Sequence, residues 1–517
     1  MNILFVMYGD FTSNSANLLV LYTRELHKMG HHCAVAVPYN TESIIQHGPV
    51  HFQAFLYEQV LSNPVAIFDN KQPADVMHAW TPREIVREFV VAYMTQIPTP
   101  LVIFQEDNEA WLAQQVLGNS AREISRLTGN EISQKLSNGF SHPFHLDAFL
   151  GLADAVITIQ DKLKTTVPPW VYTNTVMVGI DTNFFTPRPP DASLKRTYHI
   201  ADNEKIIVFH GGINGFTKPG IKSLCEAIGL INQSGYPCRL LRSGPYPLDF
   251  LDQLSPEVTQ FISDLGILPK SELPRLLSLA DIFVQPGKVD PFEDLRLPCK
   301  VPEFLAMGRP LLMPKANIEY LLTNNKNVIF LEYGTAEEIS NQCIALFNDP
   351  HKANSIGKAS RLAAEKYFDV RVQAPILEKV YDKARARYYP AYAQMWQDPK
   401  MHSNFPIMLA NKLRHLCEKT SDNKFDFDCN VSEILEQFSG YIEKTEERAY
   451  EMQERIQPMQ DRIQSIKKRN QKLLKVIKRS NYFKLKRYFG KLQYKISKLF
   501  NSHSRRKVER KYKSCES

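Results

Sequence analysis

The sequence predicts an α/β protein with two doubly wound domains, each built on a parallel sheet. Two series of apolar, strand-like runs alternate with helical segments, and a proline-rich break at Pro187, Pro189 and Pro190 separates them. The 517 residues suffice for two or three domains. Hydrophobic residues make up 44% and charged residues 23% of the chain, as expected for a globular protein with large cores.

The first domain is expected over residues 1–186, where the first forty residues indicate a strand, a helix and a strand. Residues 3–7 are wholly apolar, which suits a buried parallel strand. Asn14 or Ser15 can cap the helix that follows, and Gly30 stands where a helix end favours a left-handed residue. Later strand-like runs lie at residues 33–37, 75–78, 101–105 and 155–159.

The second domain is expected over residues 187–370. It begins with a strand at residues 206–209, a glycine-containing loop at 211–218 and a helix at 221–232. Later strand-like runs lie at residues 239–242, 282–285 and 310–313. Because open α/β sheets bind ligands beyond the carboxyl ends of their strands, we expect the functional residues in the loops that follow these runs.

The start of the chain indicates a strand and not a signal peptide, because no basic segment precedes the apolar run. No apolar run reaches the roughly 18 to 20 residues that a membrane-spanning helix needs. The eight cysteines include no Cys-x-x-Cys pair, which favours reduced thiols over a metal cluster or a disulfide framework. We therefore expect a cytoplasmic protein.

Charge divides the chain into an acidic body and a basic end. Residues 461–517 carry 20 Lys and Arg and three acidic residues, a net charge of +17 that leaves −9 for residues 1–460. Residues 481–517 place apolar and aromatic side chains on one helical stripe flanked by lysines, which is typical of a helix lying on an anionic membrane. A peripheral membrane association is therefore expected and nucleic-acid binding is not, although binding to nucleic acid and a solvated tail are the alternatives.

Residues 396–430 show no regular pattern and are interpreted as a linker. Residues 431–480 carry apolar side chains in a 3-4 repeat that is typical of a coiled coil, with Asn470 at an inner position and Pro458 as an interruption. A homodimer formed through this repeat and a helix packed back on the body are both open.

The linker sequence at residues 178–187, Val-Gly-Ile-Asp-Thr-Asn-Phe-Phe-Thr-Pro, resembles that of the retaining GT-B glycosyltransferases of family four. The likeness continues over residues 273–287 and is strongest over 290–310, which begin Asp-Pro-Phe-Glu-Asp-Leu-Arg. It covers about residues 1–395. The resemblance implies the GT-B fold, with two Rossmann-like domains facing a cleft and a return helix at about residues 371–395. It also implies transfer of a sugar, with retention, from a nucleotide-diphosphate donor to a hydroxyl of a glycan or lipid-linked acceptor.

In the resembled family the donor diphosphate binds at the loop after the first strand of the second domain. Backbone N–H groups of Gly211 and Gly212 can approach the phosphates, the next helix adds its N-terminal dipole, and Lys218 supplies a cation. Such a site stabilises the leaving diphosphate without a metal or other cofactor, so none is expected. Ser243 and Gly244 end a neighbouring strand and are expected beneath the phosphates.

One position departs from the family pattern. Ile213 stands where relatives have an arginine, and Arg242 or Arg296 is the available substitute. Lys300 is either a phosphate ligand or an exposed charge, and the sequence slightly favours the exposed charge.

Glu303 matches the second glutamate of the family's Glu-x7-Glu motif, which binds the ribose hydroxyls. Asp290 and Phe292 resemble the family's Glu-Pro-Phe at the donor sugar, but twelve residues separate Asp290 from Glu303. Because this spacing is longer than in the family, Glu293 or Asp294 is the alternative candidate for the contact with the sugar.

Three segments of the first domain follow strands and are expected to line the acceptor side. The acceptor-binding candidates are Gly9, Asp10, His78, Trp80, Arg83, Asp107 and Glu109. Glu106 is the candidate base, and Lys218 and Asp290 complete the catalytic set. The carboxylates at 106–109 are equally suited to capping a helix, His78 to packing at a strand end, and Trp80 to filling the core.

We therefore expect a retaining glycosyltransferase of cell-envelope glycan or glycolipid assembly. A nucleotide-sugar epimerase or hydrolase of the same fold, and a weakly active scaffold that acts through the coiled coil, are the alternatives.

Overall fold

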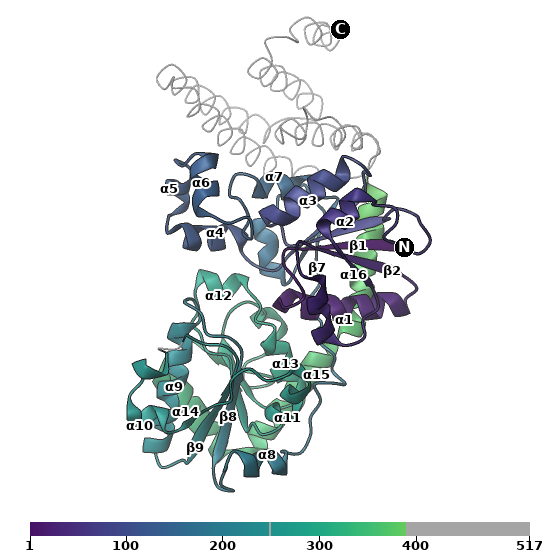
Figure 1. Ribbon diagram of the computed structural model, residues 1–517. Helices are drawn as coiled ribbons and strands as arrows, with labels where there is room; N and C mark the ends of the chain where they lie inside the picture. The colour runs from purple at the N-terminus through teal and green to yellow at the C-terminus, as the bar shows by residue number, and fades with distance from the viewer. Residues whose placement is uncertain (248–249, 389–517) are drawn as a thin grey trace, which may run out of the picture. The chain divides into compact units, whose positions relative to one another are not determined.

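The computed structural model describes residues 1–247 and 250–388, and it confirms the predicted fold class of two Rossmann-like parallel sheets (Figure 1). The first sheet has seven strands in the order β3-β2-β1-β4-β5-β6-β7, and the second has six in the order β10-β9-β8-β11-β12-β13. The predicted linker at 396–430, the coiled coil at 431–480 and the basic segment at 481–517 lie outside the described residues.

The first sheet and its helices form what we call the first lobe. Its strands are β1 (Asn2–Met7), β2 (His32–Val37), β3 (Gln53–Leu56), β4 (Val76–Trp80), β5 (Leu101–Gln105), β6 (Ala155–Thr158) and β7 (Thr173–Thr175). Its helices are α1 (Asn14–Lys28), η1 (Thr41–His47), α2 (Tyr57–Ser62), α3 (Glu84–Met94), α4 (Glu109–Leu117), α5 (Ala121–Ile124), α6 (Gly129–Lys135), α7 (Leu146–Leu152) and η2 (Asp161–Thr166).

The second sheet and its helices form the second lobe. Its strands are β8 (Lys205–His210), β9 (Cys238–Ser243), β10 (Ile262–Asp264), β11 (Ile282–Val284), β12 (Leu311–Pro314) and β13 (Ile329–Leu331). Its helices are α8 (Ala192–Thr197), α9 (Lys218–Gln233), η3 (Leu251–Gln253), α10 (Pro256–Thr259), η4 (Lys270–Glu272), α11 (Leu273–Leu277), α12 (Pro291–Leu295), α13 (Lys300–Ala306), η5 (Glu319–Leu321), α14 (Ala336–Asn348) and α15 (Pro350–Tyr367).

Successive residues of the central strands face different cores, because side chains alternate across a sheet. In β1, Ile3, Phe5 and Met7 belong to one buried cluster, whereas Leu4 and Val6 belong to another. Strand β8 is divided in the same way in the second lobe. Both faces of each sheet are therefore covered, which explains why the central strands are wholly apolar in sequence.

The first helix starts one residue earlier than predicted. Ser13, and not Asn14 or Ser15, is the N-cap of α1, and its hydroxyl accepts a hydrogen bond from the N–H of Ala16. Gly30 has a φ of 87°, in the left-handed region that the sequence predicted for this helix end.

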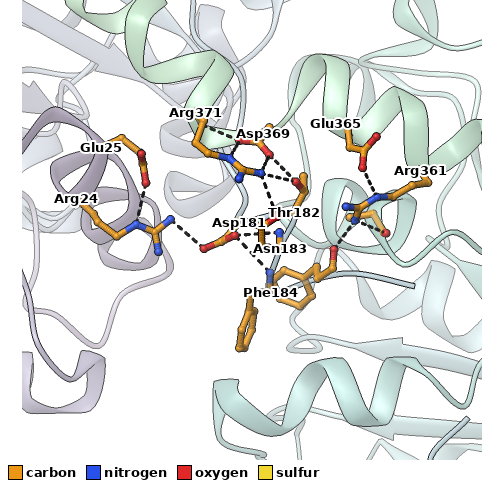
Figure 2. A network of polar contacts seen from close by, with 12 residues as sticks. Arg24, Glu25, Asp181, Thr182, Asn183, Phe184, Arg361, Glu365, Asp369 and Arg371 are labelled. Carbon is orange, nitrogen blue, oxygen red and sulfur yellow. Dashed lines mark hydrogen bonds and ion pairs between the residues drawn. The ribbon is translucent and has the colours of Figure 1, made fainter. Parts of the chain in front are cut away.

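The chain passes from the first lobe to the second and back, and the two crossing segments run side by side. Ile180 and Asp369 form a parallel bridge. Arg371 donates hydrogen bonds to the carboxylate of Asp369 at 2.8 Å and to the hydroxyl of Thr182 at 2.9 Å (Figure 2). The helix that follows, α16 (Val370–Arg387), packs against α1 and against β4, β5 and β6 of the first lobe.

Among residues 1–247 and 250–388, no helix has both the length and the apolarity to cross a membrane. Five cysteines fall within the same part of the chain, at positions 33, 225, 238, 299 and 343, and all are free thiols.

Strand order reverses at one point in each sheet. In the first sheet the chain leaves β1 toward β2 on one side and returns to β4 on the other, and β8, β9 and β11 repeat this pattern in the second sheet. Ligands of open α/β sheets bind at such switch points, beyond the carboxyl ends of the strands. The candidate residues follow β1, β4 and β5 in the first lobe and β8, β9 and β11 in the second.

Candidate functional site

A lysine ammonium lies against the glycine loop that follows β8. Gly211 has a φ of 133°, and a side chain there would place its Cβ 2.6 Å from Cε and 2.7 Å from Nζ of Lys300. Lys300 also lies over the ring of Phe209, with its Nζ 4.9 Å from the ring centroid. Burial and then the nearby Arg296 lower the Lys300 pKa to about 8. Lys300 is therefore not the exposed charge that the sequence favoured.

Two cations beside a glycine loop form a site suited to an anion. Arg296 lies 3.3 Å from Glu293, and its positive charge lowers the Lys300 pKa. A bound anion would offset this repulsion and the cost of burying the ammonium group. Arg242, by contrast, is fully buried and donates to Asp264 and to the backbone carbonyl of Gly244, so it supports the loop from behind. Arg242 and Arg296 were the two candidates to replace the arginine that relatives have at position 213. Of these, Arg296 is the one next to Lys300.

The start of α9 places a helix N-terminus after the same glycine loop. Lys218 is its first residue, and the N-cap Thr217 makes no side-chain hydrogen bond to the helix. Within the first turn, the N–H of Lys218 donates to the carbonyl of Asn214 at 2.9 Å, Pro219 has no N–H, and the N–H of Ile221 donates to the carbonyl of Thr217 at 3.1 Å. Gly220 is therefore the first-turn residue that can offer its N–H to an anion. Ser243 is buried at the end of β9, and Gly244 packs so closely on Gly211 that a Cβ would lie 2.6 Å from its carbonyl oxygen.

Glu303 lies in the first turn of α13 and faces the end of β8. Its Oε2 is 2.7 Å from Nε2 of His210, and both side chains are largely shielded, with 14% and 13% of their surface exposed. His210 was not among the predicted site residues. Its position directly before the two glycines of the loop is the signal in the sequence that could have identified it.

The segment after β11 forms the short helix α12, and its first carboxylate is a cap. Asp290 accepts hydrogen bonds from the N–H groups of Phe292 and Glu293 through Oδ1, at 3.0 and 2.9 Å. Glu293 is 6% exposed and points toward Gly287, where a Cβ would lie 3.2 Å from its Oε1. Burial raises the Glu293 pKa, and the charge of Arg296 partly opposes that increase.

On the first lobe, Glu106 is a buried carboxyl held by two donors. Ser15 donates to Oε2 at 2.6 Å and the indole N–H of Trp80 to Oε1 at 2.9 Å. Burial raises the Glu106 pKa to about 7, although both hydrogen bonds favour the charged form. A carboxyl that titrates near neutral pH is suited to exchanging a proton with a substrate.

Arg83 neutralises part of the remaining carboxyl cluster. It lies over the ring of Tyr8, 3.9 Å from the centroid, and its Nε is 3.4 Å from Glu109. Burial raises the pKa values of both Asp107 and Glu109, and Arg83 opposes this increase. The side-chain cap of α4 is Asn108, and Glu109 lies in the first turn, where the helix dipole favours a carboxylate. Glu106 and Asp107 precede the cap, so the helix end does not explain them.

Four acceptor-side candidates have structural roles in this arrangement. His78 and Trp80 are each 1% exposed: His78 is bonded to Tyr381 of α16 at 2.7 Å, and its ring stacks on Trp80. Burial lowers the His78 pKa to about 3, which keeps the imidazole neutral. Asp10 accepts hydrogen bonds from Thr12 and Asn40, and Gly9 packs near Tyr39. The indole of Trp80 therefore holds Glu106 from within the core, and the imidazole of His78 packs behind that indole. These are the packing roles that the sequence allowed for His78 and Trp80 as alternatives to acceptor binding.

The two carboxyl edges lie within electrostatic reach of each other. Cys299, the residue before Lys300, has its pKa raised to about 12, first by burial and then by Glu106 of the first lobe and Glu303 of the second. Asp107 is in turn stabilised by the charge of Arg296. Glu106 and Asp107 from the acceptor side and Glu303 from the donor side thus lie within electrostatic reach of Cys299.

Comparisons with known proteins agree with this geometry. Residues 204–349 match the family described as Glycosyl transferases group 1. No curated protein sequence matches the chain. Similar solved structures include HepE from Anabaena with UDP and glucose, at 15% identity and a TM-score of 0.54 over 74% of this chain and 99% of that one.

Two further structures share the fold to the same extent. Sucrose-phosphate synthase from Thermosynechococcus elongatus is 14% identical with a TM-score of 0.54, over 75% of this chain and all of that one. A glycosyltransferase from Rickettsia africae is 12% identical with a TM-score of 0.54, over 74% and 98%. The fold is therefore GT-B, and the family match supports a glycosyltransferase.

Proposed function

We propose that the chain is a glycosyltransferase that binds a nucleotide-diphosphate sugar at the carboxyl edge of the second sheet. The observation that carries this proposal is the contact of Lys300 with Gly211, in the glycine loop that leads into α9. Backbone N–H groups, a helix N-terminus and a buried ammonium are each suited to a diphosphate. The group 1 match over residues 204–349 and the fold shared with HepE, which was solved with UDP and glucose, support the same assignment.

The remaining donor groups follow from their positions. Glu303, oriented by His210, is suited to the ribose hydroxyls. Asp290 uses one carboxylate oxygen to cap α12, so Glu293 is the better candidate for the sugar. Lys218 stands at the start of α9 and would be a further cation for the phosphates, in addition to Lys300 and Arg296. These groups would stabilise charge on the leaving diphosphate without a metal.

On the acceptor side, Glu106 would orient the attacking hydroxyl. Transfer breaks the bond between the anomeric carbon and the diphosphate oxygen and forms one to the acceptor oxygen. We propose that both events occur on one face of the sugar, with retention, and that the acceptor proton passes to the departing phosphate. A glycan or lipid-linked acceptor of cell-envelope assembly fits such a reaction. Proton NMR of the product's anomeric signal tests retention, and activity in EDTA tests independence of metal.

The donor site is tested by thermal shift with UDP, GDP, ADP and their sugar conjugates. One nucleotide should raise the melting temperature of the wild type, since a ligand at 100 times its Kd stabilises the native state by about 2.7 kcal/mol. Lys300→Met and Glu303→Gln should each weaken this binding by about tenfold or more, because each removes a direct charged contact.

Lys358→Met is the matched control, because Lys358 is an exposed lysine on α15. It should bind nucleotide as the wild type does. Failure of every nucleotide to stabilise the wild type would contradict the proposal, as would full binding by Lys300→Met. Release of nucleotide at full rate without any acceptor would instead favour a hydrolase or an epimerase.

A further inference from the structure

Helix α12 belongs to the second lobe and carries Glu293, the candidate carboxylate for the donor sugar. Two of its other side chains contact residues of the first lobe. It is only five residues long, Pro291–Leu295. Its inner residue Glu293 faces Gly287 in the proposed donor site, whereas Phe292 and Asp294 contact residues of the first lobe. A helix this short has little stability of its own, so its position depends on these contacts.

The first contact is an aromatic stack. The indole of Trp111, on α4, lies 4.4 Å from the ring of Phe292 with 23° between the planes. Phe216, from the loop before α9, lies 5.3 Å from Trp111 and 5.8 Å from Phe292. One first-lobe residue thus packs against both loops that would surround a donor.

The second contact is polar and comes from a different first-lobe segment. The Lys162 ammonium, on η2, lies 2.5 Å from Asp294 and 2.5 Å from Glu319. The buried amide of Gln160 donates to the backbone carbonyl of Asp294 at 3.0 Å. The pKa of Lys162 is raised overall, because the two carboxylates outweigh the opposing effect of burial. This lysine therefore stays charged.

Within the second lobe, α12 is supported by its cap Asp290, by the pairing of Arg296 with Glu293, and by Asn317. Asn317 donates to the carbonyl of Glu293 at 3.2 Å and to Asp294 at 3.3 Å. Its φ of 49° is in the left-handed region, where a non-glycine residue is uncommon. These second-lobe contacts and the two first-lobe contacts together set the place of Glu293.

We propose that Trp111 and Lys162 are positioning residues, which set the donor-sugar carboxylate Glu293 only while the first lobe contacts α12. The inference rests on the proposed function. When the lobes separate, α12 loses both contacts, and a nucleotide bound at Gly211 and Lys300 lacks its sugar ligand. The enzyme thereby assembles its sugar-binding group together with the acceptor side, which limits loss of the donor to water.

The test compares a nucleoside diphosphate with its sugar conjugate in the full chain. UDP and UDP-glucose, GDP and GDP-mannose, and ADP and ADP-glucose are titrated calorimetrically, and the pair that the wild type binds is used. Lys162→Met should keep diphosphate binding within about twofold, because Gly211 and Lys300 lie in the second lobe. Trp111→Ala also removes a contact with Phe216 of the phosphate loop, so it should weaken diphosphate binding, but less than it weakens binding of the sugar conjugate. Both variants should weaken binding of the sugar conjugate by about tenfold and raise the ratio of donor hydrolysis to transfer.

Two nearby variants serve as controls. Val116→Ala changes an exposed residue of the same helix as Trp111, and Lys164→Met changes a lysine of η2 that pairs with Asp161. Both should behave as the wild type. Equal loss of diphosphate and sugar-conjugate binding in Trp111→Ala and Lys162→Met, or no loss of either, would overturn the inference while leaving the proposed function intact. A wild type that binds none of the six ligands would overturn both.

Discussion

Glu106 is the residue whose chemistry the structure defines most closely. Its carboxyl is held by Ser15 and Trp80 and has its pKa raised to about 7, primarily by burial. In the unfolded chain a glutamate titrates near 4.3. Because the pKa of Glu106 is higher in the folded state than in the unfolded chain, the protonated carboxyl makes its full contribution to stability below the unfolded pKa. That contribution is lost as the pH rises toward 7.

Replacing Glu106 with Gln should therefore separate stability from activity. At pH 8 the variant avoids the cost of ionising a buried carboxyl. Its free energy of unfolding should therefore exceed that of the wild type by up to about 3 kcal/mol. At pH 4 to 5 the wild-type group is neutral, and the difference should nearly vanish. Transfer should fall by at least about tenfold, because an amide binds the attacking hydroxyl less strongly than a carboxylate does.

Urea unfolding at pH 4.5 and pH 8, together with an assay of transfer, checks these outcomes. A variant less stable than the wild type at pH 8 would show that the ionised carboxylate stabilises the fold. Full activity would remove Glu106 from the reaction.

Residue types and their places in the loops could be predicted from the sequence, but their partners could not. Glu303 and the glycine loop could be named as candidates, because each matches a family pattern, and their roles stay predictions. The contact of Lys300 with Gly211 brings together positions 89 residues apart, and no local spacing reveals it. His78 follows the same rule, since its partner Tyr381 lies 303 residues along the chain.

Among the elements, the start of α16 joins the two crossing segments through one carboxylate. Asp369 is the N-cap of α16, and it also binds Arg371 and Thr182 (Figure 2). Burial would raise its pKa, but these hydrogen bonds lower it overall. The folded pKa is the lower one, so this stabilisation is present above the unfolded pKa. It is lost as the pH falls through the folded pKa.

Asp369→Ala should lower the free energy of unfolding by about 1–3 kcal/mol, because it removes a cap, a buried hydrogen bond with Thr182 and a partly buried one with Arg371. The loss should be largest at neutral pH and shrink in acid, where the wild-type carboxyl is itself protonated. Chemical unfolding over a pH series measures this. Asp382→Ala, on the exposed side of the same helix, is the control, and an equal effect there would argue against the crossing contact.

Central strands could be predicted and edge strands could not. Every apolar run assigned to a strand is one, because both faces of a central strand are buried and its residues are apolar throughout. The four strands at the sheet edges, β3, β7, β10 and β13, escaped prediction. They are three or four residues long, and β3, β7 and β10 contain no fully buried residue. Such segments carry too weak a pattern.

At the scale of the whole molecule, the contrast between an acidic body and a basic end remains a prediction from the sequence. Co-sedimentation with vesicles that contain anionic lipid should be lost when residues 481–517 are deleted. Each lysine or arginine near such a surface contributes about 1 kcal/mol, and high salt should weaken the binding. Neutral vesicles are the control. Unchanged pelleting of the shortened chain would rule out membrane binding through this segment.

The return of α16 to the first lobe also bears on how the chain is made. Leu377, Val380 and Tyr381 are buried in that lobe, and Tyr381 bonds to His78. Domains usually fold in the order of their synthesis, N-terminal first. Here a nascent chain emerging from the ribosome must produce the entire second lobe before the last part of the first core becomes available. The lobe that is translated first is therefore completed last, and until then its unfilled apolar surface is open to chaperones.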